Sequence, residues 1–150
     1  MRVVFLDTGP LGLISNPRGT PEAVRCRQWV KDLSAAGIRV MVPEIADYEV
    51  RRELIRAGKL PGLRRLDQVD ALLDFAPITS DIMVRAAELW ADARNQGRPT
   101  APPEALDGDC ILAATAMLTA EPDDDVVVAT ANASHLGLFV TALPWQVIHP

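Results

Sequence analysis

Near its amino end the chain reads Val3-Val4-Phe5-Leu6-Asp7-Thr8-Gly9-Pro10-Leu11-Gly12. Four consecutive apolar residues with high β-propensity predict a strand that is buried on both faces, as in a parallel sheet covered by helices. Gly9 and Pro10 then break the run. Asp7 is therefore predicted at the carboxyl end of a buried strand, which is the edge where open α/β sheets bind their ligands.

A carboxylate at this position has two explanations. Asp7 can cap the turn that follows, or it can form part of a polar site, because a buried charge is costly unless it is paired or binds a metal. The stretch alone leaves both open. The choice depends on whether other acidic residues arrive at the same edge of the sheet.

The composition fits a single domain spanning residues 1–150 with a full hydrophobic core. Hydrophobic residues make up 49% of the chain and charged residues 23%, the balance of an ordinary globular domain. No apolar run reaches about 18 residues and no basic and apolar leader is visible, so neither a transmembrane helix nor a signal peptide is expected. The net charge of −5 argues against a protein that coats nucleic acid through its overall field, but it is compatible with a local basic groove.

Strand-like and helix-like stretches alternate along the rest of the chain. Helices are predicted from their apolar spacing at 21–36, 44–57, 63–74, 80–96 and from 107 onward. Short β-rich runs predict strands at 39–42, 75–78, 126–129 and 146–149, with connections at 60–62 and 98–103. This order indicates an α/β fold, a three-layer α/β/α sandwich with a mainly parallel central sheet.

The same apolar spacing assigns three large side chains to the core. Trp29 falls on the inner face of the helix at 21–36. Met83 and Trp90 fall on the inner face of the helix at 80–96, which Ser80 is expected to cap.

Further acidic residues accompany two of the predicted helices. Glu49 lies on a charged helix face, where ion pairing within the helix is a sufficient explanation and periodicity does not distinguish it from Glu44 or Glu53. Asp107 is a natural cap for the apolar helix that follows it, and Asp109 suits the dipole of the first turn. Capping explains either acid, but it explains less well a pair that faces a buried environment.

If the strand ends converge, Asp7 and Asp109 meet in one pocket, with Asp107 and Glu49 as further candidates. Several carboxylates cannot all stay ionised in a dry site without a cation. Oxygen ligands at this density suit Mg²⁺ or Mn²⁺, and hydrolysis of a phosphodiester by a metal-activated water is the natural chemistry. The turn after the strand at 126–129 is expected to face the Asp7 turn.

The sequence lacks the signatures of several other chemistries. It has no Gly-rich phosphate loop, no Ser-centred elbow and no Cys/His metal spacing. Cys26 and Cys110 are expected to be buried thiols in a reducing cytoplasm. The histidines, His135 and His149, are expected in capping or surface roles.

Cations gather in the predicted helical hairpin at 44–74. They are Arg51, Arg52, Arg56, Lys59, Arg64 and Arg65. Nearby acids partly offset them, so a solvated charged face is one explanation. A surface that contacts phosphates is the other.

Four motifs in order resemble a PIN-domain nuclease, in particular a VapC-type ribonuclease toxin of a toxin–antitoxin pair, over almost the whole chain. They are Val4-Phe5-Leu6-Asp7-Thr8-Gly9-Pro10-Leu11; Val42-Pro43-Glu44-Ile45 with Tyr48-Glu49-Val50-Arg51-Arg52-Glu53-Leu54; Asp107-Gly108-Asp109 with Ile111-Leu112-Ala113-Ala114-Thr115-Ala116; and Val127-Val128-Ala129-Thr130-Ala131-Asn132 with His135-Leu136. Each motif alone is weak, and their order makes the resemblance fairly specific.

The resemblance implies that Asp7, Glu49 and Asp109 hold a divalent metal, and it selects Glu49 where spacing could not. Thr8, Thr130 and Asn132 are secondary candidates. The chain departs from the family pattern after the fourth strand, where Thr130, Asn132 and His135 stand and many members have an aspartate. Either Asp107 supplies the missing charge or Asn132 holds a metal-bound water, which leaves the number of ions open.

The main hypothesis is a cytoplasmic endoribonuclease that depends on Mg²⁺ or Mn²⁺ and acts as the toxin of a toxin–antitoxin pair. Arg51, Arg52 and Arg56 are candidate RNA or antitoxin contacts. By resemblance, the chain is expected to form a homodimer and to be inhibited by a cognate antitoxin, with no membrane association.

Two other hypotheses remain. One is a PIN-fold module that binds RNA or protein with weak or no catalysis, motivated by the missing fourth acid. The other is a phosphatase or phospho-acceptor domain that uses Asp7 as nucleophile. That hypothesis expects a lysine near the pocket, whereas Lys31 and Lys59 are both assigned to helices.

Overall fold

A computed structural model describes the backbone of residues 1–97 and 103–150, and the side chains of all of these except 103–105. Most of the connection predicted at 98–103 lies outside the described residues. Pro103, its last residue, is the first residue of a helix.

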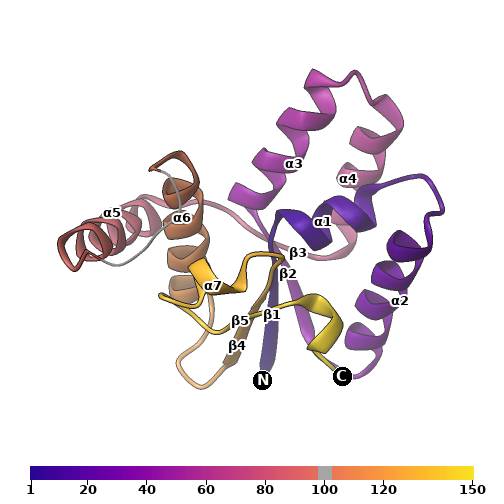
Figure 1. Cartoon of the computed structure of the whole chain (residues 1–150). Helices are drawn as coiled ribbons and strands as arrows, with labels where there is room; N and C mark the ends of the chain where they lie inside the picture. Colours follow the sequence, from indigo (N-terminus) through magenta and orange to yellow (C-terminus); the bar gives the residue numbers. More distant parts are fainter. Residues whose placement is uncertain (98–102) are drawn as a thin grey trace.

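The described residues contain one sheet of five parallel strands in the order β3-β2-β1-β4-β5 (Figure 1). The strands are β1 (Arg2–Leu6), β2 (Arg39–Pro43), β3 (Asp74–Ala76), β4 (Asp125–Ala129) and β5 (Ala142–Leu143). The chain builds the sheet outward from β1 to β3 and then returns to the other side of β1 with β4. The predicted parallel α/β architecture is confirmed.

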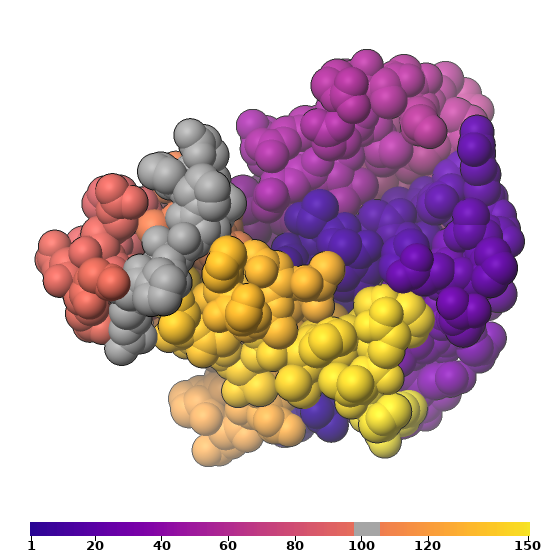
Figure 2. All heavy atoms as spheres, viewed as in Figure 1, coloured from indigo at the N-terminus to yellow at the C-terminus, as the bar shows by residue number. Residues whose placement is uncertain are grey.

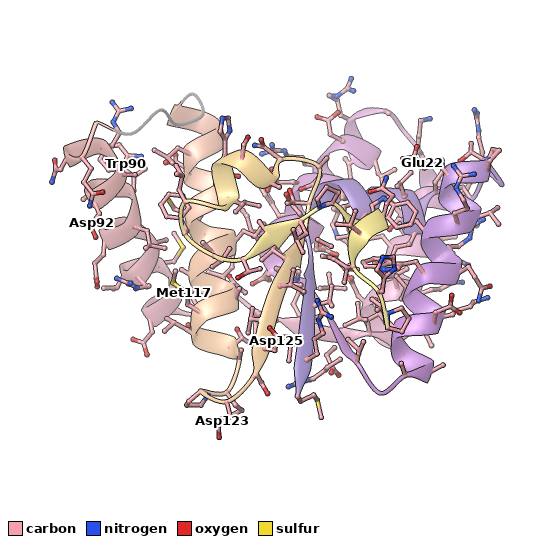
Figure 3. The ribbon with its side chains drawn as sticks, turned by 60° about the horizontal axis from the view of Figure 1, so that its bottom comes forward. Glu22, Trp90, Asp92, Met117, Asp123 and Asp125 are labelled. Carbon is pink, nitrogen blue, oxygen red and sulfur yellow. The ribbon has the colours of Figure 1, made fainter. Side chains whose placement is uncertain are left out.

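Helices cover both faces of this sheet, as Figures 1 and 3 show. They are α1 (Thr8–Ser15), α2 (Pro21–Ala35), α3 (Glu44–Arg56), α4 (Leu60–Leu72), α5 (Ser80–Asn95), α6 (Pro103–Thr119) and α7 (Ala133–Leu136), with a 3₁₀ turn at Trp145–Val147. In β1, Val4 and Leu6 pack with α1, α2 and α4, while Val3 and Phe5 pack with α6 and α7. This alternation of fully buried residues follows from a strand whose two faces are both covered.

The end of the chain is fixed against α2 rather than added to the sheet. The Trp29 indole Nε1 donates a hydrogen bond of 2.7 Å to the Ile148 carbonyl, and its ring lies 5.5 Å from that of Trp145. Trp29 is therefore in the core, as predicted. The strand predicted at 146–149 is wrong, because Trp145–Val147 form a 3₁₀ turn and the fifth strand is the short β5 before it.

Two further predictions of local structure, the connection at 60–62 and the cap of α5, are wrong. Residues 60–62 are not a connection but the first turn of α4, where Pro61 is tolerated because its missing N–H would be unpaired there. The hydroxyl that caps α5 belongs to Thr79, which accepts from the Ile82 N–H at 3.2 Å, and not to Ser80.

Met83 and Trp90 are not core residues, since they are 47% and 37% exposed. The reason is that α5 packs on α6 and not on the sheet, so only a narrow stripe of α5 is buried (Figures 1 and 3). In the ranges 1–97 and 103–150, no helix is long and apolar enough to cross a membrane.

One arginine on α3, Arg51, forms ion pairs with acids on both helices of the α3–α4 hairpin. Arg51 on α3 contacts Asp47 at 2.9 Å on its own helix, and Asp67 at 2.9 Å and Asp70 at 3.4 Å on α4. Burial opposes ionisation of Asp47, yet hydrogen bonds from Arg51 and Asp70 lower the pKa of Asp47. Burial and the hydrogen bond shared with Asp47 raise the pKa of Asp70 to about 7. One guanidinium thus compensates a cluster of acids that would otherwise repel one another.

We expect Arg51→Gln to lower the free energy of unfolding by about 2 kcal/mol, because charged hydrogen bonds are lost and the acids lose their shared cation. Chemical denaturation measures this. The matched control is Arg56→Gln on the same helix. Among the described residues Arg56 pairs with the exposed Glu53 alone, so its loss should leave stability nearly unchanged. Equal effects of the two substitutions would contradict this role for Arg51.

Candidate active site

The site lies at the carboxyl edge of the sheet, between β1 and β4. This is the point where the strand order reverses, so the connections leave in opposite directions and open a crevice. Asp7 follows β1 and Thr130 follows β4, and the Asp7 N–H donates to the Ala129 carbonyl at 2.9 Å. Asp123 and Asp125, by contrast, lie at the other end of the sheet (Figure 3).

Both carboxylate oxygens of Asp7 are held in place. Oδ1 accepts from the Thr8 N–H at 2.7 Å, and Oδ2 accepts from the Thr130 hydroxyl at 2.7 Å. The Thr130 hydroxyl itself accepts from the Asn132 N–H at 2.9 Å. Asp7 therefore caps α1 and also belongs to a polar site, and the turn after β4 faces it as expected.

Glu49 reaches this edge from α3 and lies close to α6. Gly108 on α6 lies next to this carboxylate, since a Cβ there would be 3.4 Å from Glu49 Oε1. Burial, and then the charges of Asp7 and Asp109, raise the pKa of Glu49, while the Arg52 guanidinium 3.9 Å away opposes them. Gly108 was not among the predicted site residues, and its place between two aspartates is the only sequence signal for it.

Asp109 enters the site from α6. Burial and the charge of Asp7 raise its pKa to about 6, and His135 acts in the opposite direction. Its Oδ2 atom is buried and has no hydrogen-bond partner among the described residues. Asp7 thus acts electrostatically on both Glu49 and Asp109. That the three acids form one metal pocket stays a prediction.

Asp107 is placed differently from Asp109. Because α6 begins at Pro103, Asp107 is not the cap of that helix, and Asp109 does not lie in its first turn. Asp107 is exposed and lines a depression between α5 and α6 with Met83 and Trp90. The structure does not bring it together with the other three acids.

The position where the resemblance expects a fourth acid is occupied by Asn132 and His135. The Asn132 side-chain nitrogen lies 3.0 Å from His135 Nδ1. His135, on α7, is close enough to influence the pKa of Asp109. Figure 2 shows the start of α1 recessed between α3 and the segment that carries α7.

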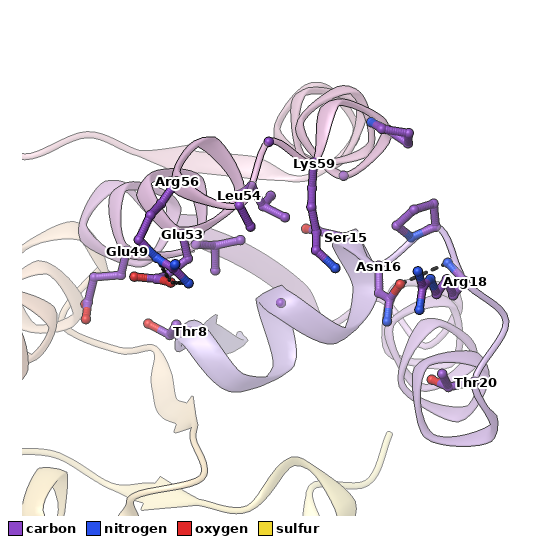
Figure 4. A pocket seen from close by; sticks show the side chains of 17 residues that line it. Thr8, Ser15, Asn16, Arg18, Thr20, Glu49, Glu53, Leu54, Arg56 and Lys59 are labelled. Atoms are coloured by element: carbon purple, nitrogen blue, oxygen red, sulfur yellow. Dashed lines mark hydrogen bonds and ion pairs between the residues drawn. The ribbon is translucent and has the colours of Figure 1, made fainter.

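A groove of about 800 Å³ runs from the site along α1 (Figure 4). Thr8 and Glu49 line one end of it, and Arg18 and Lys59 line the other. Lys59 is not on a helix as expected but in the connection between α3 and α4. Thr8 Oγ1, at the acidic end, is buried without a hydrogen-bond partner among the described residues.

The three predicted contact arginines differ in their surroundings. Arg51 is committed to the α3–α4 acids described above. Arg52 lies over the Tyr48 ring, 5.1 Å from its centroid, and Arg56 pairs with Glu53 at 2.8 Å. Of the three, only Arg56 lines the groove.

The donor set fits a hard divalent cation. Burial and neighbouring carboxylates raise the pKa of Glu49 and Asp109, and Asp109 Oδ2 has no hydrogen-bond partner among the described residues. A cation would relieve both features. Within the part of the chain that the structure describes, no group of three or more acidic, Cys or His side chains is close enough to hold an ion by itself. Mg²⁺ does not need such a cage, because it binds through one or two carboxylates and keeps its waters.

In EDTA, we expect Asp109→Asn to raise the melting temperature at pH 8 by about 2–4 °C, a shift typical of ~1 kcal/mol in a domain of this size. The folded state raises the Asp109 pKa from 3.8 to about 6, so its ionisation costs stability that is retained below 3.8 and lost above 6. The difference should vanish at pH 4, and Asp107→Asn should show none. A gain that is independent of pH would contradict this account.

Comparisons with known proteins agree with this fold. The structure of VapBC2 from Rickettsia felis, bound to a DNA fragment from their promoter, is similar to this chain with a TM-score of 0.70 at 14% identity, covering 95% of this chain and 98% of that chain. VapBC-1 from nontypeable Haemophilus influenzae gives a TM-score of 0.63 at 16% identity, with coverages of 96% and 98%. Mycobacterium tuberculosis VapC20, a sarcin-ricin loop cleaving toxin, gives 0.54 at 17% identity, with coverages of 80% and 91%.

At such low identities these likenesses concern the fold. No curated protein sequence matches significantly. A family model of the PIN domain matches residues 4–136, a range that contains Asp7, Glu49 and Asp109. The chain therefore belongs to the PIN-domain family.

Proposed function

We propose that this chain is a divalent-metal-dependent endoribonuclease, the toxin of a toxin–antitoxin pair, in which residues 1–150 act as one PIN domain. The observation that supports the proposal is that burial and the charge of Asp7, at the end of β1, raise the pKa of both Glu49, on α3, and Asp109, on α6. Such a cluster opposes folding unless a cation joins it. A cluster that costs stability in this way supports a role in function rather than in folding.

Asp7, Glu49 and Asp109 are the residues that would hold Mg²⁺ or Mn²⁺. When bound, the ion supplies charge stabilisation at the phosphodiester and lowers the pKa of a water molecule. Thr130 and the Thr8 N–H fix the orientation of Asp7, so the carboxylate is arranged before any ligand arrives. Asp109 must be ionised to act as a ligand, so metal affinity is expected to fall as the pH drops through about 6.

Asn132 and His135 take the place of the missing fourth acid in this proposal. An amide oxygen is a suitable partner for a water molecule at the metal site. Asp107 stays a predicted catalytic residue, but its position between α5 and α6 gives it no support.

The proposed partners are an RNA strand, a cognate antitoxin and a second copy of the chain in the cytoplasm. Some of the similar structures are VapBC complexes. Tyr48, Met83 and Val84 are exposed apolar side chains on α3 and α5, which suits a surface that another protein covers. The buried free thiols Cys26 and Cys110 suit a reducing compartment.

We expect the purified chain to cleave a labelled RNA pool in Mn²⁺ or Mg²⁺ but not in EDTA. Asp7→Asn and Asp109→Asn should each lower the rate at least about 100-fold, because each removes a metal ligand. Asp125→Asn, at the opposite end of the sheet, should cleave like the parent. Cleavage that survives both site substitutions would contradict the assignment, and metal binding without cleavage would favour the PIN-fold binding module.

Thr130→Val should weaken Mn²⁺ binding and lower the cleavage rate about 10- to 100-fold, the usual cost of losing a residue that orients a metal ligand. Isothermal titration with Mn²⁺ reports binding independently of cleavage. Thr115→Val is the matched control. Thr115 is also buried, and its hydroxyl donates only to the Ile111 carbonyl of its own helix. Equal losses in both variants would indicate a general structural effect.

A further inference from the structure

A second depression, of about 460 Å³, lies beyond the cationic end of the groove. It is lined by Pro17, Arg27, Pro61, Arg64, Arg65 and Gln68. Three arginines, one from α2 and two from α4, thus meet without any acidic side chain in the lining. We call Arg27, Arg64 and Arg65 the arginine cluster.

The cluster differs from the other cations of the α3–α4 hairpin. Arg51, Arg52 and Arg56 all lie within 4 Å of a carboxylate, whereas no member of the cluster makes an ion pair within the described part of the chain. Three guanidinium groups without acidic partners are unexpected in a chain whose net charge is −5. Mutual repulsion makes such a group unfavourable by itself, so a bound anion would stabilise it.

Backbone contacts hold two of these side chains at the end of α1. Arg27 Nη1 donates to the Asn16 carbonyl at 2.8 Å, and Arg65 Nε donates to the Ile14 carbonyl at 3.3 Å. Cations are favourable at the carboxyl end of a helix, and each of these two side chains uses one N–H group in its hydrogen bond there. A guanidinium has five N–H donors, so most remain available to a ligand. Arg64 is exposed and makes no hydrogen bond or ion pair among the described residues.

The helix α1 connects this cluster to the acids. Its first residue, Thr8, adjoins Asp7, and the Ile14 and Asn16 carbonyls at its other end accept from the cluster. Eight helical residues span about 12 Å. The groove runs along this length, and it shares the lining residues Pro17 and Pro61 with the depression, so the two hollows adjoin.

We propose that the arginine cluster binds a backbone phosphate of single-stranded RNA, about one α1 length from the phosphodiester that lies at the acids. This inference rests on the proposed ribonuclease function. Guanidinium forks match the geometry of phosphate oxygens. A nucleic acid carries phosphate at every nucleotide, so a strand held at the acids also presents phosphate along α1. The cluster positions the strand and does not take part in the chemistry.

An acidic protein segment is the competing ligand for the same cations. The groove favours RNA because Glu49 lines its other end, where an acidic peptide would be repelled. RNA could approach Glu49 because its phosphates can share a divalent ion with the proposed metal ligands.

The test measures binding of fluorescent oligouridylate, about 20 nucleotides long, to the full chain carrying Asp7→Asn, by anisotropy at several salt concentrations. We expect adding Arg64→Gln to weaken binding about three- to tenfold and to reduce the slope of log K against log salt by about 0.7, the value for one lost phosphate contact on a single strand. Arg27→Gln with Arg64→Gln should about double the loss of slope. Arg64→Lys should retain most of the slope, since it keeps the charge.

Arg25→Gln is the matched control, because it removes one charge from the exposed surface of α2 outside the depression. It should bind RNA like the parent. Melting temperatures identify any variant that is not folded, and Arg64→Gln should melt like the parent since its side chain makes no contact that the fold needs.

An unchanged salt slope in the double variant, or no RNA binding by the parent, would overturn the inference. So would weaker binding of polyglutamate by the variants without a change in RNA binding, because the cluster would then be a protein site. Cleavage by the wild-type chain is measured separately. If the wild-type chain cleaves RNA but the salt slope of the variants is unchanged, only the role of the arginine cluster is rejected. If the salt slope falls but the wild-type chain does not cleave RNA, the RNA-binding surface is supported and the nuclease function is rejected.

Discussion

The repulsion among Asp7, Glu49 and Asp109 is the constraint on which the rest of the site depends. Burial and neighbouring charge raise the pKa of Glu49 and Asp109, so the folded chain holds these groups in a less favourable state than the unfolded chain. The rest of the structure must offset the unfavourable free energy of holding these acids together. It does so through a fully buried β1 and through hydrogen bonds from Thr8 and Thr130 that hold Asp7.

Each acid depends on a different structural support. Asp7 is placed by the switch in strand order, which sets β4 and its Thr130 beside β1. Glu49 depends on α3, which Arg51 joins to α4 through a cluster of acids. Asp109 depends on α6, whose Gly108 lies next to the Glu49 carboxylate. A site assembled from three supports can be lost by a change in any one of them, at some distance from the acids.

The sequence predicted what depends on local pattern. Apolar runs revealed β1 and β4, their alternation with helices revealed the parallel sheet, and the break after Leu6 revealed Asp7. It could not distinguish Glu49 from Glu44 and Glu53, because that difference arises from packing against α6. The resemblance to PIN domains made the choice.

Prolines and amphipathic faces account for most of the incorrect predictions. Pro61 and Pro103 lie in the first turns of α4 and α6, where proline is favourable, yet both were interpreted as breaks in regular structure. The shift in the start of α6 removed the capping role of Asp107. Trp90 was assigned to the core because helical periodicity identifies an apolar face but not the width of the surface that covers it. Here most of the buried residues that cover α5 belong to α6.

Charge is distributed along α1 in a way that composition conceals. The overall charge of −5 describes an acidic protein, and the six cations of the hairpin look alike in the sequence. They differ in their partners in the structure. Arg51 pairs with acids of α3 and α4, and Arg52 and Arg56 pair with glutamates of α3. Arg64 and Arg65 instead lie with Arg27 of α2 around the depression. Acidic side chains therefore lie at the start of α1, and basic side chains lie at its end. A polyanion bound at the acids could therefore extend along the groove toward the arginine cluster in the adjoining depression.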